Sequence, residues 1–211
     1  LQGTGLRAQF DSSTNSYRIE KEPASGLLPT VRIESTTEGT GSYTTGLTNT
    51  ATRLDLSIRE TPQSVTVMTR QRIEDQGLEE ISEVLNQAVG VVLVNSGPLG
   101  SDNNTIYSRG FPLENYQVDG VARSTRFGFQ NDIADMAIFD RVEVVRGASG
   151  LLNGVGQPSG AVNLVRKLPT TEFQAHVAGK YGSWDHYRME GDISGPITED
   201  GKIRARLVGA W

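Results

Sequence analysis

The sequence predicts a small α+β domain followed by antiparallel strands that have one apolar and one charged face. Three observations carry this prediction. A glycine-rich block at residues 138–169 places two short strand-like runs around a loop. Residues 78–89 show the spacing of apolar side chains that is typical of a helix, and after Pro169 apolar and polar residues alternate.

The composition excludes several classes of protein. The 211-residue chain carries 20 Lys and Arg against 25 Asp and Glu, a net charge of −5, which gives no general affinity for nucleic acid or an anionic membrane surface. It has no cysteine, so disulfides and thiolate metal sites are excluded. No apolar run is long enough for a membrane-spanning helix, and residues 1–6 do not resemble a signal peptide. We expect the chain to be part of a longer protein, because it stops at Trp211 inside an alternating run.

The first 53 residues predict a hairpin followed by a linker. Residues 6–10 and 17–20 flank a polar turn cluster, so residues 1–21 are expected to end a small β-rich domain. From residue 22 to residue 53, Gly, Ser and Thr dominate and apolar residues are sparse. This range is predicted to be a linker, with one strand-like island at residues 30–33.

Residues 54–169 are predicted to form the α+β domain. A first helix is expected at residues 69–76 with Thr69 as its cap, and a second at residues 78–89, followed by Gly90 as a stop. The expected strands are residues 64–68, 91–95, 106–109, 116–118, 141–145 and 161–165.

Residues 170–211 are predicted to form three antiparallel strands. In residues 173–181, 187–195 and 203–211, apolar and polar side chains alternate along each run. One apolar and one charged face suit a membrane barrel with a water-filled interior. A soluble sheet with one wet face has the same pattern, and the alternation leaves both readings open.

No pattern in the chain predicts catalysis, a cofactor or a metal site. Residues 154–160 have one residue too many for a G-x-G-x-x-G loop, and Pro158 prevents the helix start that would hold a phosphate, so a tight structural loop is expected instead. The two histidines, His176 and His186, lie in the alternating region. Ser108 is not in a nucleophile elbow.

Two arginines occupy parallel positions. Arg109 and Arg146 each follow an expected strand and precede a glycine. An uncompensated buried guanidinium is costly, so buried roles would require carboxylate partners. The ordinary alternative is that both are surface charges. We expect paired, buried roles.

Several motifs stand in the order found in the plug of TonB-dependent outer-membrane receptors. They are TPQSVTV at 61–67, RIEDQG at 72–77, YSRGF at 107–111, YQVDG at 116–120 and the glycine-rich block at 138–169. The chain resembles this family from end to end. Residues 41–52 and 182–187 make it most similar to the transducer-type ferripyoverdine receptor group.

The resemblance implies a division of the chain into four parts. Residues 1–21 would be the end of an N-terminal signalling domain, 22–53 a linker with the TonB box, 54–169 the plug, and 170–211 the first strands of a transmembrane β-barrel. The TonB box would comprise Thr30, Val31, Arg32, Ile33 and Glu34.

The resemblance also implies a function. It is TonB-dependent import of a ferric siderophore, of the pyoverdine or hydroxamate type, across the bacterial outer membrane, with cell-surface signalling. The implied partners are TonB, the siderophore, a periplasmic anti-sigma regulator and outer-membrane lipid, with no nucleic acid. The plug and the N-terminal segment would face the periplasm. The alternative is a regulatory periplasmic interaction module without transport.

Five residues receive roles on this reading. Arg109 and Arg146 would pair with carboxylates on the inner barrel wall, beyond Trp211. The expected ligand contacts are Tyr116, Arg126 and Phe129, since aromatic rings offer flat apolar area and an arginine can meet an anionic ligand oxygen. The ordinary alternatives are a core position for Phe129 and a solvated loop charge for Arg126.

Overall fold

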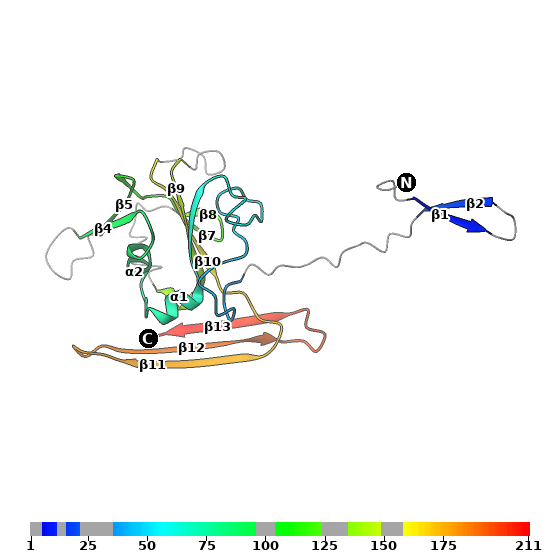
Figure 1. Cartoon of the computed structure of the whole chain (residues 1–211). Coiled ribbons are helices and arrows are strands. Elements are labelled where there is room, and N and C mark those ends of the chain that lie inside the picture. Colours follow the sequence, from blue (N-terminus) through cyan, green and yellow to red (C-terminus); the bar gives the residue numbers. More distant parts are fainter. Residues whose placement is uncertain (1–5, 12–15, 22–35, 96–103, 124–134, 149–157) are drawn as a thin grey trace. The chain divides into compact units, whose positions relative to one another are not determined.

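The computed structural model describes residues 6–11, 16–21, 36–95, 104–123, 135–148 and 158–211, and the chain divides into two units after Glu34. The first unit contains one antiparallel hairpin, formed by β1 (Leu6–Asp11) and β2 (Ser16–Lys21). The hairpin predicted from the polar turn cluster is therefore present (Figure 1).

The second unit is built on a five-stranded mixed sheet with the order β3-β9-β10-β7-β8. Its strands are β3 (Ser64–Met68), β7 (Tyr116–Val118), β8 (Val121–Arg123), β9 (Phe139–Arg146) and β10 (Gly160–Arg166). The central strands β9 and β10 are antiparallel, whereas β7 runs parallel to β10. Residues far apart in the sequence thus form one sheet, and the predicted α+β class is confirmed.

Helix α1 (Arg70–Asp75) begins where the sequence predicts. The hydroxyl of Thr69 accepts a hydrogen bond from the backbone N–H of Arg72 and so caps the first turn. Ile73 is the buried apolar residue of this helix and packs toward the sheet.

Helix α2 (Ile81–Asn86) is shorter than the predicted range of 78–89. The carboxylate of Glu83 accepts hydrogen bonds from the backbone N–H groups of Glu79 and Glu80, at 2.8 and 3.1 Å, and this starts the helix at Ile81. Leu78 precedes the helix and still packs against the core. Its apolar side chain therefore matched the spacing of the helix although the residue is not helical.

The main hydrophobic core lies between the helices and the sheet. Its most completely buried members are Met68, Ile73, Val84, Leu85, Met136, Phe139, Val142, Val144, Val162 and Leu164. Met136 belongs to η1 (Met136–Ile138), a short 3₁₀ helix that leads into β9.

Residues 36–53, here called the N-terminal strap, pack against the same domain. Thr37, Thr48 and Thr50 of the strap are buried. The predicted linker is therefore wrong for this part of 22–53, because threonine hydroxyls and backbone N–H groups bind polar groups of the sheet instead of remaining in water. Residues 22–35 lie outside the described residues.

Two further sheets complete the unit. β4 (Val91–Asn95), β5 (Asn104–Ser108) and β6 (Phe111–Pro112) form a small antiparallel sheet. β11 (Gln174–Tyr181), β12 (Tyr187–Pro196) and β13 (Arg204–Ala210) form a three-stranded antiparallel sheet. The β11–β13 sheet lies alongside the α+β domain, near α1 (Figure 1).

The β11–β13 sheet has the two faces that the alternation predicted. Val177, Met189 and Leu207 are exposed on one face. On the other face, Asp192 and Ser194 are buried against the α+β domain. Within the described ranges, no helix combines the length and apolar character needed to cross a membrane.

Candidate functional site

Asp140 on β9 binds the start of the N-terminal strap. Its carboxylate accepts hydrogen bonds from the backbone N–H of Thr37, at 3.0 and 2.9 Å, and of Glu38, at 2.7 Å. The hydroxyl of Thr36 donates to the same carboxylate at 3.0 Å. Asp140 is only 1% exposed. A buried carboxylate without donors would be destabilising, so these bonds stabilise both the strap and the strand.

Glu143, also on β9, binds a later part of the strap. One carboxylate oxygen accepts from the hydroxyls of Thr48 and Thr50, the second of these at 2.6 Å. The other oxygen accepts from Nε of Arg141 at 2.6 Å, and Arg141 also reaches Asp140 at 2.9 Å. Asp140, Arg141 and Glu143 thus form one buried ionic group on the central strand, and this group binds the strap at two points.

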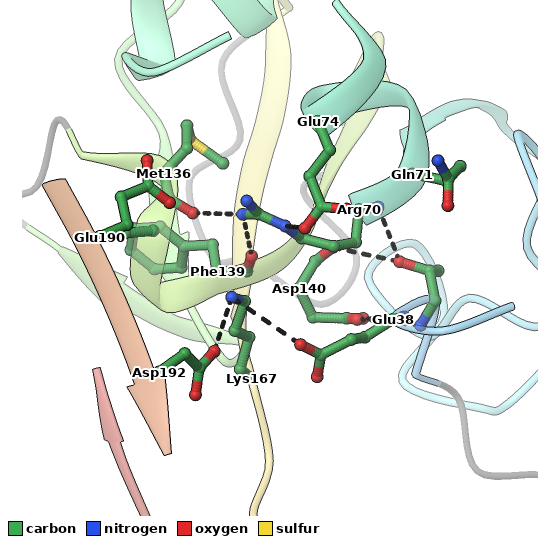
Figure 2. Close-up of polar contacts among 12 residues, drawn as sticks. Glu38, Arg70, Gln71, Glu74, Met136, Phe139, Asp140, Lys167, Glu190 and Asp192 are labelled. Carbon is green, nitrogen blue, oxygen red and sulfur yellow. Dashed lines mark hydrogen bonds and ion pairs between the residues drawn. The ribbon is translucent and has the colours of Figure 1, made fainter. Parts of the chain in front are cut away.

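Arg70, the first residue of α1, connects the helix, the sheet and the strap. Figure 2 shows its guanidinium directed at the carbonyl oxygens of Met136 and Phe139, at 2.8 and 3.2 Å, and at Glu74, at 2.6 Å. The backbone N–H of Arg70 donates to the hydroxyl of Thr37 at 3.0 Å. Displacing Thr37 would therefore disturb the start of α1 as well as Asp140.

Two groups of charges join the domain to the β11–β13 sheet. The first, here called the Glu38 cluster, contains Glu38, Lys167, Asp192 and Arg206. Arg206 donates to both oxygens of Glu38, at 2.6 and 2.5 Å, and to both oxygens of Asp192, at 2.8 and 2.5 Å. Lys167 lies between the two carboxylates, 2.9 Å from Asp192 and 3.8 Å from Glu38 (Figure 2).

The second group, the Asp135 cluster, contains Glu79, Asp135, Lys180 and Arg188. Arg188 binds both oxygens of Asp135 at 2.8 Å, and Lys180 binds Glu79 at 2.8 Å. Burial alone would raise the pKa of Asp135, but hydrogen bonds from Arg188 and from the backbone N–H of Ala137 outweigh it and lower that pKa below its ordinary value. Asp135 therefore stays ionised and paired at neutral pH.

Members of both clusters line one pocket of about 220 Å³ between α1, η1 and the β11–β13 sheet. Lys167 and Asp192 come from the first cluster, and Glu79 and Arg188 from the second. The contact between domain and sheet thus includes several ion pairs, and apolar side chains such as Ile73, Met136 and Val208 line the same pocket.

The structure brings the two predicted arginines close together. Arg109 is exposed, with its backbone at φ 54°, and its guanidinium lies against Gly147, the residue after Arg146. Arg146 is half-buried and donates to the hydroxyl of Ser64 at 2.6 Å. Neither guanidinium has an ion pair with a carboxylate from the described part of the chain. Their pairing with carboxylates outside this chain stays a prediction.

The predicted ligand contacts are not brought together by the described residues. Tyr116 is 2% exposed and belongs to the hydrophobic core, where burial raises the pKa of its phenol. This burial favours a structural role for Tyr116. Arg126 and Phe129 lie outside the described residues, and so does the expected TonB box at residues 30–34.

Sequence reasoning missed the residues that hold the strap and the sheet. A signal for two of them was available, because Asp140 and Glu143 alternate with apolar residues in a strand next to the glycine-rich block, and buried carboxylates need donors. Glu38 and Arg206 carried no such signal, since Glu38 lies in a polar stretch and Arg206 lies on the polar side of an alternating strand.

Comparisons with known proteins identify the relatives of this arrangement. Residues 57–161 match the model of the TonB-dependent Receptor Plug Domain. A ferric-pyoverdine BN7/BN8 receptor of Pseudomonas putida is 48% identical over 99% of this chain. The ferripyoverdine receptor of Pseudomonas aeruginosa is 42% identical over 100% of it. The chain spans 26% and 27% of the length of these two relatives.

Solved structures of outer-membrane siderophore receptors are similar to this chain as well. The crystal structure of the P. aeruginosa outer-membrane ferripyoverdine receptor bound to ferripyoverdine matches 99% of this chain, with a TM-score of 0.75 and 42% identity, and is covered to 26%. The alcaligin outer-membrane receptor of Bordetella pertussis matches 84% of the chain, with a TM-score of 0.77 and 49% identity, and is covered to 31%.

Proposed function

The chain belongs to the TonB-dependent siderophore receptors, and we therefore propose that the protein carrying it imports a ferric siderophore across the bacterial outer membrane. The observation that supports this most strongly is the similarity over 99% of the chain to receptors named for ferric pyoverdine. We propose a ligand of the pyoverdine or hydroxamate type.

The proposed mechanism involves no chemical step on the ligand, and we infer neither catalysis nor a resident cofactor. The siderophore binds the extracellular face of the plug, where we place Arg126 and Phe129. TonB binds the extended segment at residues 30–34 by strand addition in the periplasm. Ligand and TonB therefore bind two distinct sites, which is a condition for allosteric coupling between them.

The strap supports this arrangement. It begins two positions after Glu34 in the sequence and is bound to the central strand through Asp140 and Glu143. A pull on the TonB box would therefore be transmitted to the plug sheet through these polar contacts.

We further propose that β11–β13 are the first strands of the barrel wall. Their exposed apolar face, which includes Val177 and Leu207, suits outer-membrane lipid. Their charged face meets the plug. In this location the plug and the N-terminal segment face the periplasm, and the hairpin β1–β2 belongs to a domain that signals to an anti-sigma regulator.

The alternative is a signalling module without transport, and one experiment separates the two. Uptake of iron-loaded pyoverdine is measured in cells that carry the full-length receptor or a variant without residues 30–34. A deletion of residues 24–28 is the control, because it shortens the same region equally. Loss of uptake only in the first deletion supports import. Normal uptake with a lost transcriptional response would contradict import through this segment.

A further inference from the structure

We propose that the ion pair between Glu38 and Arg206 is a latch that fastens the N-terminal strap to the barrel wall and opens to release the strap. The proposal rests on the proposed function in two respects, namely that force enters the plug through residues 30–34 and that β11–β13 belong to the barrel wall. Glu38 lies four positions after Glu34 in the sequence. Among the ion pairs within the described residues, it is the strap's direct link to the wall strands.

The geometry of the pair is that of a specific contact. The two terminal nitrogens of Arg206 each bind one oxygen of Glu38, at 2.6 and 2.5 Å. The side chain of Arg206 is 7% exposed and that of Glu38 is 25% exposed. Two-point binding by a planar guanidinium in a partly dry site is stronger and more directional than a surface ion pair.

The surroundings allow the latch to open without leaving its partners uncompensated. When Glu38 leaves, Arg206 keeps both oxygens of Asp192, and Lys167 keeps Asp192 as well. The same holds for Asp140, which binds the start of the strap. Asp140 keeps its ion pair with Arg141 when the backbone of the strap moves away. Since an unpaired buried charge is what makes breaking an ion pair costly, these second partners lower the cost of release and favour re-closure.

The Asp135 cluster offers an internal comparison. Asp135 and Arg188 form the same kind of two-point contact between plug and wall, at 2.8 Å. Asp135 precedes η1 in the body of the plug and does not belong to the strap. The two ion pairs differ in the segment that they hold, and the side chain of Asp135, at 46% exposed, is also more exposed than that of Glu38, at 25%. Loss of the Asp135 pair should loosen the plug body from the wall and leave the strap docked.

The test measures strap release in the full-length receptor by thiol labelling. Thr37 is 2% exposed, and Thr37→Cys places a thiol that reacts with a maleimide only when the strap lifts. This chain has no cysteine of its own, and any others in the receptor are replaced. Labelling rates are compared in the Thr37→Cys background for no further change, Glu38→Gln, Arg206→Lys and Asp135→Asn.

We expect Glu38→Gln to raise the labelling rate about tenfold, as loss of a charged hydrogen-bond partner implies, and Asp135→Asn to change it less than about twofold. Arg206→Lys keeps the positive charge but cannot bind both oxygens of Glu38 with a planar guanidinium, so it should also raise the labelling rate. An unchanged rate in Glu38→Gln, or an equal rise in Asp135→Asn, would overturn the latch. Uptake of ferric pyoverdine by the unmodified receptor is assayed separately, so a failure of the transport proposal is recognised independently of the labelling result.

Discussion

Glu143 places a carboxylate in the interior of the plug with three donors around it. The hydroxyls of Thr48 and Thr50 come from the strap, and the guanidinium of Arg141 comes from the same strand. At 0% exposure, the carboxylate depends on these donors in place of water. We therefore expect the Glu143 carboxylate to contribute more to the stability of the plug than an exposed carboxylate with similar partners.

Replacing this carboxylate should loosen the strap and the sheet together. We expect Glu143→Gln to destabilise the closed plug by about 3 kcal/mol, the usual size for removing one partner of a buried ionic group. Hydrogen exchange of the β3 amides in the full-length receptor measures this opening. Glu60→Gln is the matched control, because Glu60 also accepts from a hydroxyl and a backbone N–H, both of Ser57, but is exposed. Equal exchange rates in the two variants would contradict a special role for Glu143.

Among the elements, the pairing of β9 with β10 depends on a glycine. Gly160 begins β10 opposite Arg146, with φ at +118°. A Cβ there would lie 2.0 Å from the carbonyl oxygen of Val145, which no side chain can accommodate. The glycine at this position therefore allows the second strand to return tightly along the first.

Gly160→Ala should prevent this return. We expect a loss of more than about 3 kcal/mol, because the clash is with backbone and the pair is central to the sheet. The yield and unfolding temperature of the full-length receptor in outer-membrane fractions measure the effect. Gly39→Ala is the control, since Gly39 also has a positive φ, +71°, but nothing lies within 4 Å of an added Cβ. Equal stability of the Gly160→Ala and Gly39→Ala receptors would show that the strands can repack.

In the whole molecule, the proposed barrel must hold the plug, and we propose that β11–β13 are the first strands of its wall. The described contacts between the plug and these strands include the ion pairs of the Glu38 and Asp135 clusters. Arg109 and Arg146 lie near one another, and each lacks an ion pair within the described residues, so they are candidates to meet carboxylates on wall strands outside this chain.

If Arg146 holds the plug against that wall, Arg146→Ala should weaken the contact between plug and barrel and allow small solutes to pass through the receptor. We expect greater sensitivity to detergent and to large antibiotics in cells that carry the full-length variant. Arg166→Ala is the comparison, because Arg166 pairs with Asp119 at an exposed position, where ion pairs contribute little. Sensitivity unchanged by Arg146→Ala would rule out this role.

The local elements could be predicted from the sequence alone. The Thr69 cap, the strand at residues 64–68 and the two faces of β11–β13 follow from periods of two or 3.6 residues and from short-range hydrogen bonds, which neighbouring residues contain in full. The length of α2 escaped this reasoning, because Leu78 packs in the core without being helical.

Which charges meet was settled by tertiary packing. Asp140 and Thr37 are 103 residues apart, and Arg206 and Glu38 are 168 apart. The local sequence pattern does not predict such pairs, because the choice of partner depends on how the strap and the β11–β13 strands pack around the domain. The range predicted as a linker became a packed strap for the same reason: its threonines were polar in the sequence, and the fold supplied the buried carboxylates that they bind.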